Sequence, residues 1–184
     1  MFRKIRKILI AVTVLGCIFA GYVALQPAAA NMVRMATIAA PPAEVFARVN
    51  DLHKWQEWSP WARLDPDAKV SYEGPQAGYG AAFLWSGNSE VGEGKMTLIE
   101  SKPNEKIKFR IDLLKPMAGS NTSEFTFEPD GEGTYVIWRM TGERTFLQRA
   151  LCIIFGAEKI AGDQFEQGLA NLSAVVTGKP VAQR

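Results

Sequence analysis

The residue types that perform acid–base or nucleophilic chemistry are few in this chain and lie far apart. His53 is the single histidine, and it follows Leu52 near an expected helix end. General acid–base catalysis would need this imidazole in a cleft beside a carboxylate, whereas its surroundings favour an exposed side chain. Acidic residues on expected strands, such as Asp112, Glu124 and Glu128, share the parity of solvent-facing neighbours. The sequence therefore leans away from an enzyme without deciding the question.

The same scarcity argues against a metal or a cofactor. One histidine and two separated thiols, Cys17 and Cys152, do not supply the ligands of a usual transition-metal site. Cys17 lies in an apolar run, so a disulfide to Cys152 would draw the rest of the chain into a bilayer. Gly74, Gly78 and Gly80 lack the strand-to-helix context of a phosphate-binding loop and favour turns and bulges. We expect no metal, cofactor or disulfide.

The distribution of charge argues against a nucleic-acid partner. The formal net charge is +2, and Arg3, Lys4, Arg6 and Lys7 supply four of the positive charges at the N-terminus. The remaining residues therefore carry a net charge near −2, which gives no basic face for a phosphate backbone.

Aromatic side chains are the more conspicuous candidates for a binding site. Trp55, Trp58 and Trp61 recur at every third residue. They could rim a cavity or contact lipid headgroups, or they could pack a junction between helices and sheet. The usual burial of tryptophan favours packing, with at least one of the three bordering a cavity.

Further apolar residues take inward-facing positions on expected strands. Each could fill a core, but as a set they favour a partly open cavity, because one helix must cover a large aromatic face. Arg139 would reach an anionic ligand only if the alternation of the strand around it were reversed. The candidate ligand-binding residues are Trp58, Trp61, Phe83, Trp85, Met96, Phe109, Phe125, Trp138, Arg139 and Phe165.

These candidates belong to a pattern of strands followed by a helix. Alternation and turn residues predict a first strand, a short helix beginning at Pro42, six further strands and a helix over residues 147–177. The strands are expected at residues 32–39, 69–73, 81–86, 94–101, 106–114, 122–128 and 134–141. An α+β fold, with a curved antiparallel sheet wrapped around a long C-terminal helix, satisfies this order and leaves a cavity between them.

The beginning of the last helix is apolar all round at residues 151–155. This segment could act as a lid, as a surface resting on a membrane, or as ordinary core. The sequence favours core, although one-sided burial does not require apolarity around the whole turn.

The N-terminal segment reads as a membrane anchor. A basic stretch precedes an apolar run at residues 8–25, long enough as a helix to span about 27 Å at about 1.5 Å per residue. The run is longer than the apolar region of about 7–15 residues that is usual in a signal peptide, which favours an uncleaved anchor. Alternatives are cleavage near Ala28–Ala30 and a lipoprotein signal at Cys17, after which the chain stays apolar.

Positive charge before the run predicts an N-terminus in the cytoplasm. The folded part would then lie outside that membrane, in the periplasm of a Gram-negative cell. We expect residues 1–30 to form the anchor and a linker starting at Gln26, and residues 31–184 to form one domain.

Several short motifs stand out along the chain. They are residues 40–46 (APPAEVF), 55–61 (WQEWSPW), 74 with 78–80 (GYG), 85–88 (WSGN), 91–94 (VGEG), 133–134 (GT) with Val136 and 138–140 (WRM), and 165–172 (FEQGLANL). Together these motifs resemble the START-like (SRPBCC) superfamily, also called the polyketide cyclase/dehydrase and lipid transport family, in a membrane-tethered bacterial branch. The resemblance covers residues 32–177 and implies a helix-grip fold with an apolar pocket, lined by residues such as the inward-facing aromatics.

The superfamily includes lipid carriers and aromatase/cyclases, so the fold does not decide the function. The leading hypothesis is a membrane-tethered module that binds a hydrophobic or lipid-like small molecule. One alternative is a polyketide cyclase- or dehydratase-like enzyme, which requires two inward-facing ionisable residues within hydrogen-bonding reach. Another is an envelope protein-interaction module with an unknown protein partner, which requires an exposed apolar patch.

Overall fold

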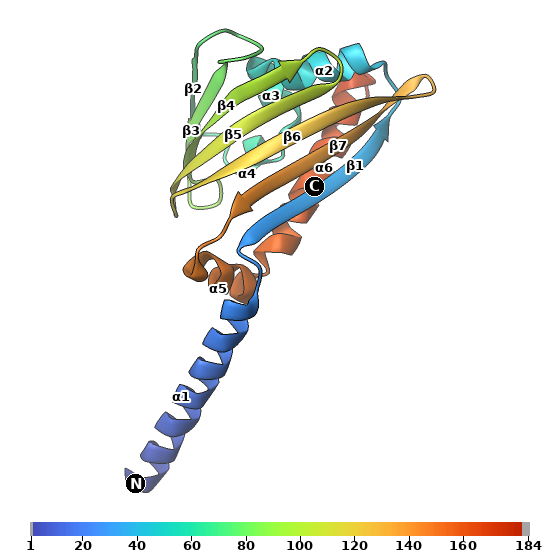
Figure 1. Cartoon of the computed structure of the whole chain (residues 1–184). Coiled ribbons are helices and arrows are strands. Elements are labelled where there is room, and N and C mark those ends of the chain that lie inside the picture. Colours follow the sequence, from blue (N-terminus) through green and yellow to red (C-terminus); the bar gives the residue numbers. More distant parts are fainter. Residues whose placement is uncertain (1, 182–184) are drawn as a thin grey trace.

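The computed structural model describes residues 2–181 of the chain, and within them a single seven-stranded antiparallel sheet forms the body of the protein (Figure 1). The strand order is β1-β7-β6-β5-β4-β3-β2. The strands are β1 (Ala29–Ile38), β2 (Lys69–Glu73), β3 (Ala82–Ser86), β4 (Glu93–Lys102), β5 (Lys106–Lys115), β6 (Gly119–Asp130) and β7 (Gly133–Glu143).

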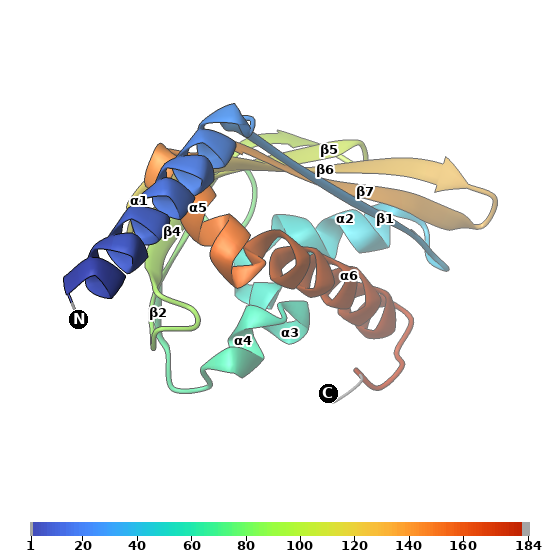
Figure 2. The same ribbon diagram turned by 90° about the horizontal axis from the view of Figure 1, so that it is seen from below.

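Helices cover one face of this curved sheet, as Figure 2 shows from below. The α+β helix-grip architecture expected from the sequence is therefore confirmed. The helices are α1 (Phe2–Leu25), α2 (Pro42–Asn50), a 3₁₀ turn (Leu52–Lys54), α3 (Trp55–Trp58), α4 (Trp61–Leu64), α5 (Phe146–Phe155) and α6 (Ala157–Val176).

The expected single C-terminal helix is two helices. Thr145 and Gln148 form a capping box that starts α5. Gly156 ends it at φ 61°, in the left-handed region that a glycine adopts without steric cost. On α6, Phe165 and Leu169 lie four residues apart, and both are buried. The break lets α5 leave the axis of α6.

Because α5 leaves that axis, the expectation that residues 151–155 form core is wrong. Ile154 and Phe155 are largely exposed, and Ala150 is the one buried residue of the helix. Its apolar character therefore does not serve the core of the described chain.

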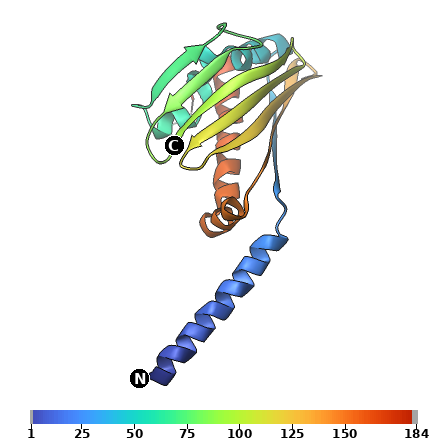
Figure 3. The same ribbon diagram turned by 60° about the vertical axis from the view of Figure 1, so that its left-hand side comes forward.

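Helix α1 leaves the domain beside α5, and its C-terminal end runs almost directly into β1 (Figures 1 and 3). The expected linker is shorter than the sequence suggested, because Ala29 and Ala30 already pair with Glu143 and Gly142 of β7. α1 is long and apolar enough to cross a membrane, and it is the one such helix among residues 2–181. Val23 is its one buried residue.

Candidate ligand-binding cavity

A cavity of about 440 Å³ lies between the sheet and the helices α3 and α4. That volume is within the range of small-molecule sites. Its wall comprises Trp55, Gln56, Ser59, Trp61, Ala62, Asp65, Pro66, Ala68, Val70, Phe83, Trp85, Glu90, Val91, Met96, Ile111, Leu113, Asn121, Ser123, Trp138 and Met140.

The cavity occupies the half of the sheet that lies nearest α5. Leu113 in its wall pairs with Gly94 and with Gly119, next to the β3–β4 and β5–β6 turns. Gln148 of α5 donates from Nε2 to the carbonyl oxygen of Ala118 in the second of these turns, at 3.3 Å. The open space is therefore on the side of the domain from which α1 leaves.

Apolar side chains fill the space between the helices and the other half of the sheet. Phe46 of α2 packs edge-on against Phe127 of β6, with ring centroids 5.7 Å apart. Leu98 and Ile107 are fully buried in the same cluster. α2 thus closes this half, while the shorter helices α3 and α4 leave the opposite half open.

Stacked aromatic rings form the boundary between the core and the cavity. The Trp138 ring lies 4.7 Å from Phe125 and 4.0 Å from Phe165, nearly parallel to both. Its indole Nε1 donates to Ser123 Oγ at 2.8 Å. This hydrogen bond fixes the rotation of the ring, so the wall that Trp138 presents is rigid.

Gly94 makes room for Trp85, which forms another part of the cavity wall. A Cβ on Gly94 would lie 2.5 Å from Cζ2 of Trp85, so this backbone approach requires a residue without a side chain. Trp85 donates from Nε1 to the carbonyl oxygen of Val91 at 3.1 Å. The Trp85 ring is therefore held over Gly94 of the neighbouring strand, and it borders the cavity.

The polar groups of the wall are mostly neutral. Gln56, Ser59, Asn121 and Ser123 line it. Ser123 Oγ accepts from Trp138 and keeps its own hydroxyl hydrogen available. The arrangement suits an apolar molecule with a small hydrogen-bonding group.

Asp65 and Glu90 are the ionisable residues of the wall. Asp65 Oδ2 accepts from the backbone N–H of Asn88 at 2.6 Å, which fixes the carboxylate to a loop. Within the described part of the chain, no hydrogen bond joins two ionisable side chains of the wall, and no group of three His, Cys, Asp or Glu residues could hold a metal ion.

The structure divides the candidate residues into two sets. The inward parity expected for the strands is confirmed, since Phe83, Met96 and Trp138 are buried. Those that border the cavity are Trp61, Phe83, Trp85, Met96 and Trp138. Those that do not border it are Trp58, Phe109, Phe125, Phe165 and Arg139.

Two physical reasons explain why residues of the second set lie away from the cavity. Trp58, Phe109 and Phe125 are fully buried among other rings and fill core space. Arg139 is exposed, because the alternation around Trp138 is regular and directs the next residue to the outer face. Trp55, for which packing was favoured, both packs on Trp58 and borders the cavity.

The sequence pattern also contained evidence for two polar wall residues that are not among the candidates. Asn121 and Ser123 share the parity of Phe125 on β6, so alternation places them inward as well. Gln56 and Ser59 carried no such signal, because the helices around them are too short to show a period.

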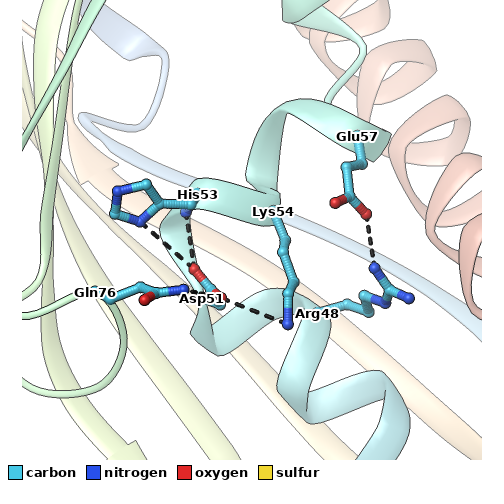
Figure 4. A network of polar contacts seen from close by, with 6 residues as sticks. All are labelled: Arg48, Asp51, His53, Lys54, Glu57 and Gln76. Carbon is cyan, nitrogen blue, oxygen red and sulfur yellow. Dashed lines mark hydrogen bonds and ion pairs between the residues drawn. The ribbon is translucent and has the colours of Figure 1, made fainter.

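His53 belongs to a separate polar network around Asp51, drawn in Figure 4. The buried Asp51 carboxylate accepts from the backbone N–H of His53 and from Gln76 Nε2, both at 3.0 Å. The imidazole stacks on Tyr72 with ring centroids 3.9 Å apart. Burial, and secondarily the charge of Asp51, raises the pKa of the Tyr72 hydroxyl. The network caps the 3₁₀ turn and joins it to a loop, and these residues lie outside the cavity wall.

Comparison with known proteins identifies the class. The family model described as "Polyketide cyclase / dehydrase and lipid transport" matches residues 29–177. The chain therefore belongs to this family. No curated protein matches the chain.

Solved structures share the fold at low sequence identity. Protein MLL2253 from Mesorhizobium loti is 18% identical, with 82% of this chain and 99% of that chain covered and a TM-score of 0.61. TTHA0849 from Thermus thermophilus is 16% identical, with 81% and 98% covered and a TM-score of 0.59. The di-domain ARO/CYC StfQ of the steffimycin biosynthetic pathway is 14% identical, with 82% and 51% covered and a TM-score of 0.60.

Proposed function

We propose that this protein is a membrane-tethered module that binds a hydrophobic or lipid-like small molecule in the cavity beside α3 and α4. The observation that carries the proposal is the cavity itself, about 440 Å³ in volume and bordered by Trp61, Phe83, Trp85 and Trp138. Burying an apolar molecule against such a wall is favourable by about 25 cal/mol per Å² of apolar surface. The family description, which includes lipid transport, supports the same class of ligand.

The packing of α1 supports a retained anchor. Val23 is fully buried, and Arg149 of α5 donates to the carbonyl oxygens of Ala24 and Gln26. A segment removed by a signal peptidase has no need of contacts with the mature domain. With basic residues at its start, α1 would keep the N-terminus in the cytoplasm and the domain outside.

A pair of substitutions on β5 tests the cavity. Leu113 borders it, whereas the next residue, Leu114, is exposed on the other face of the sheet. Leu113→Trp fills the cavity, and Leu114→Trp adds the same side chain outside it. Native mass spectrometry of the full chain, released from detergent micelles, measures bound small molecules.

We expect an adduct of one apolar molecule on the wild type and on Leu114→Trp, and its loss from Leu113→Trp. Solvent extraction of the wild-type protein then identifies the molecule. An adduct absent from the wild type, or equally present on both variants, would overturn the proposal. Circular dichroism of both variants checks that the sheet is intact.

A cyclase- or dehydratase-like activity has weaker support. Such chemistry calls for an acid and a base within hydrogen-bonding reach of one substrate. Of the two ionisable wall residues, Asp65 is bonded to a backbone N–H and Glu90 is exposed. The remaining polar side chains, such as Asn121 and Ser123, are neutral near pH 7. These groups suit the orientation of a ligand better than the transfer of a proton.

A further inference from the structure

The outer face of α5 has no partner in the described chain. Phe146, Leu147, Ile154 and Phe155, with Ile160 at the start of α6, are between 47% and 67% exposed. Leu147, Leu151 and Ile154 recur at a helical spacing, so they project from one side. We call the following six residues the α5 face: Phe146, Leu147, Leu151, Ile154, Phe155 and Ile160. Large apolar side chains exposed together on one helix mark an interaction site.

The position of the α5 face relative to α1 indicates what covers it. Figures 1 and 3 show α5 at the end of the domain from which α1 leaves, beside the last turns of that helix. Arg149 fixes the contact, since its Nη1 donates to the carbonyl oxygen of Gln26 at 2.6 Å. A bilayer crossed by α1 would therefore reach its surface at the height of α5.

Charged and aromatic residues at the junction fit the same surface. Tyr22 of α1, Arg144, Arg149 and Lys159 line a groove of about 480 Å³ beside α1 and α5. Glu158 also lines this groove and pairs with Arg144, and Lys159 pairs with Asp163 on the exposed side of α6. Tyrosine is enriched where transmembrane helices reach the headgroups, and arginine and lysine attract anionic lipids there. Apolar side chains bordered by cations are the composition of a helix that lies in a membrane interface.

We infer that the α5 face lies in the interface of the bilayer that α1 crosses and holds the domain against the membrane. This inference rests on the proposed anchor and adds an orientation to it. The cavity occupies the half of the sheet nearest α5, so docking through α5 keeps that half next to the lipid. An apolar ligand then has a short path between bilayer and cavity.

Depth-dependent fluorescence quenching of the full chain in nanodiscs tests the inference. Nanodiscs of phosphatidylcholine and phosphatidylglycerol contain doxyl lipids with the quencher either near the headgroup or deep in the acyl chain. Cys17 and Cys152 are replaced by serine, and one environment-sensitive fluorophore is attached at Ile154→Cys, Val14→Cys or Glu132→Cys. These positions report on α5, on the middle of α1, and on the exposed β6–β7 turn at the far end of the domain (Figure 1).

We expect shallow quenching and a blue-shifted emission at position 154, deep quenching at position 14 and neither at position 132. Lack of lipid quenching at position 154 overturns the inference. Deep quenching that remains at position 14 then shows that α1 still crosses the bilayer, whereas its loss shows that the proposed anchor fails as well. A blue shift at position 154 without lipid quenching would indicate a protein partner or a second copy on this face, which also overturns the inference.

A second variant shows whether the apolar face is the cause. With the fluorophore at Phe155→Cys, the added changes Leu147→Glu and Ile154→Glu place two charges on the α5 face. Both positions are exposed, so the fold is preserved. We expect the quenching at position 155 to be lost, while Leu114→Glu on the outer face of the sheet leaves it unchanged. Quenching that survives the double substitution contradicts a docking role for the α5 face.

Discussion

The guanidinium of Arg149 donates a hydrogen bond from Nη1 to the carbonyl oxygen of Gln26 at 2.6 Å, across 123 positions of sequence. The same nitrogen lies 3.4 Å from the carbonyl oxygen of Ala24. Ala24 belongs to the last turn of α1, and Gln26 follows the end of the helix directly. The last carbonyl groups of a helix have no partner within the helix and carry its negative dipole end. Arg149 supplies both the donor and the positive charge that these groups need, so it fixes α1 to α5.

Replacement of Arg149 by alanine should therefore loosen α1 from the domain. A hydrogen bond to a charged group contributes about 1.5–3 kcal/mol, and the variant loses it. Spin labels on Thr13→Cys and Glu132→Cys report the relative placement, and their distance distribution should broaden in Arg149→Ala. Arg110→Ala, which removes an exposed pairing with Asp112 on the sheet, should leave the distribution unchanged. Equal widths in both variants would refute the role of Arg149.

Ser123→Ala should destabilise the fold, because it leaves the buried Nε1 of Trp138 without its acceptor. An unsatisfied buried donor costs about 1–3 kcal/mol in the free energy of unfolding. Ser120→Ala, on the same strand, removes an exposed bond to Asp112 and should change that free energy by less than about 0.5 kcal/mol. Urea unfolding in detergent, followed by circular dichroism, measures both, and similar losses would contradict this account.

Two glycines of α6 should respond to alanine with opposite signs. A Cβ on Gly168 would lie 2.8 Å from Cζ3 of Trp138, a ring held between two others, so Gly168→Ala should cost about 1–3 kcal/mol through overpacking. A Cβ on Gly162 would meet the flexible end of Arg34, which can move aside. Gly162→Ala should then gain up to about 1 kcal/mol of helix propensity. Thermal unfolding of the two variants decides, and shifts of the same sign would disprove the assignment.

The stability conferred by Glu100 should depend on pH. A hydrogen bond from Lys106, with the charges of Lys106, Lys108 and Lys102, lowers the pKa of Glu100 below its ordinary value of 4.5. A depressed pKa in the folded state means that the stabilisation is present above the ordinary value and is lost as pH falls through the lowered one. The difference in unfolding midpoint between wild type and Glu100→Gln should therefore shrink below pH 4.5.

Glu132→Gln, in the exposed β6–β7 turn, serves as the control for this series. Its midpoint should follow the wild type across the whole pH range. A constant difference between wild type and Glu100→Gln from neutral to acid pH would show that the ion pairs do not cause the effect.

The sequence determined the strands and their faces because both depend on local order. In β5, Ile107 and Phe109 alternate with charged residues, and each side of a strand follows from a period of two. The same alternation placed Trp138 inward and Arg139 outward. The apolar length of α1 is likewise a property of consecutive residues.

The tertiary structure decided which inward residues border empty space and which fill the core. Phe109 and Trp85 both point inward from their strands. Trp55 of α3 packs on Phe109, and Phe109 is fully buried, whereas Trp85 borders the cavity beside the short helices α3 and α4. The exposure of α5 was also a tertiary outcome, since a left-handed Gly156 turned its apolar face away from the sheet. Periodicity reports the direction of a side chain, but the space in front of it depends on distant segments whose packing no local pattern encodes.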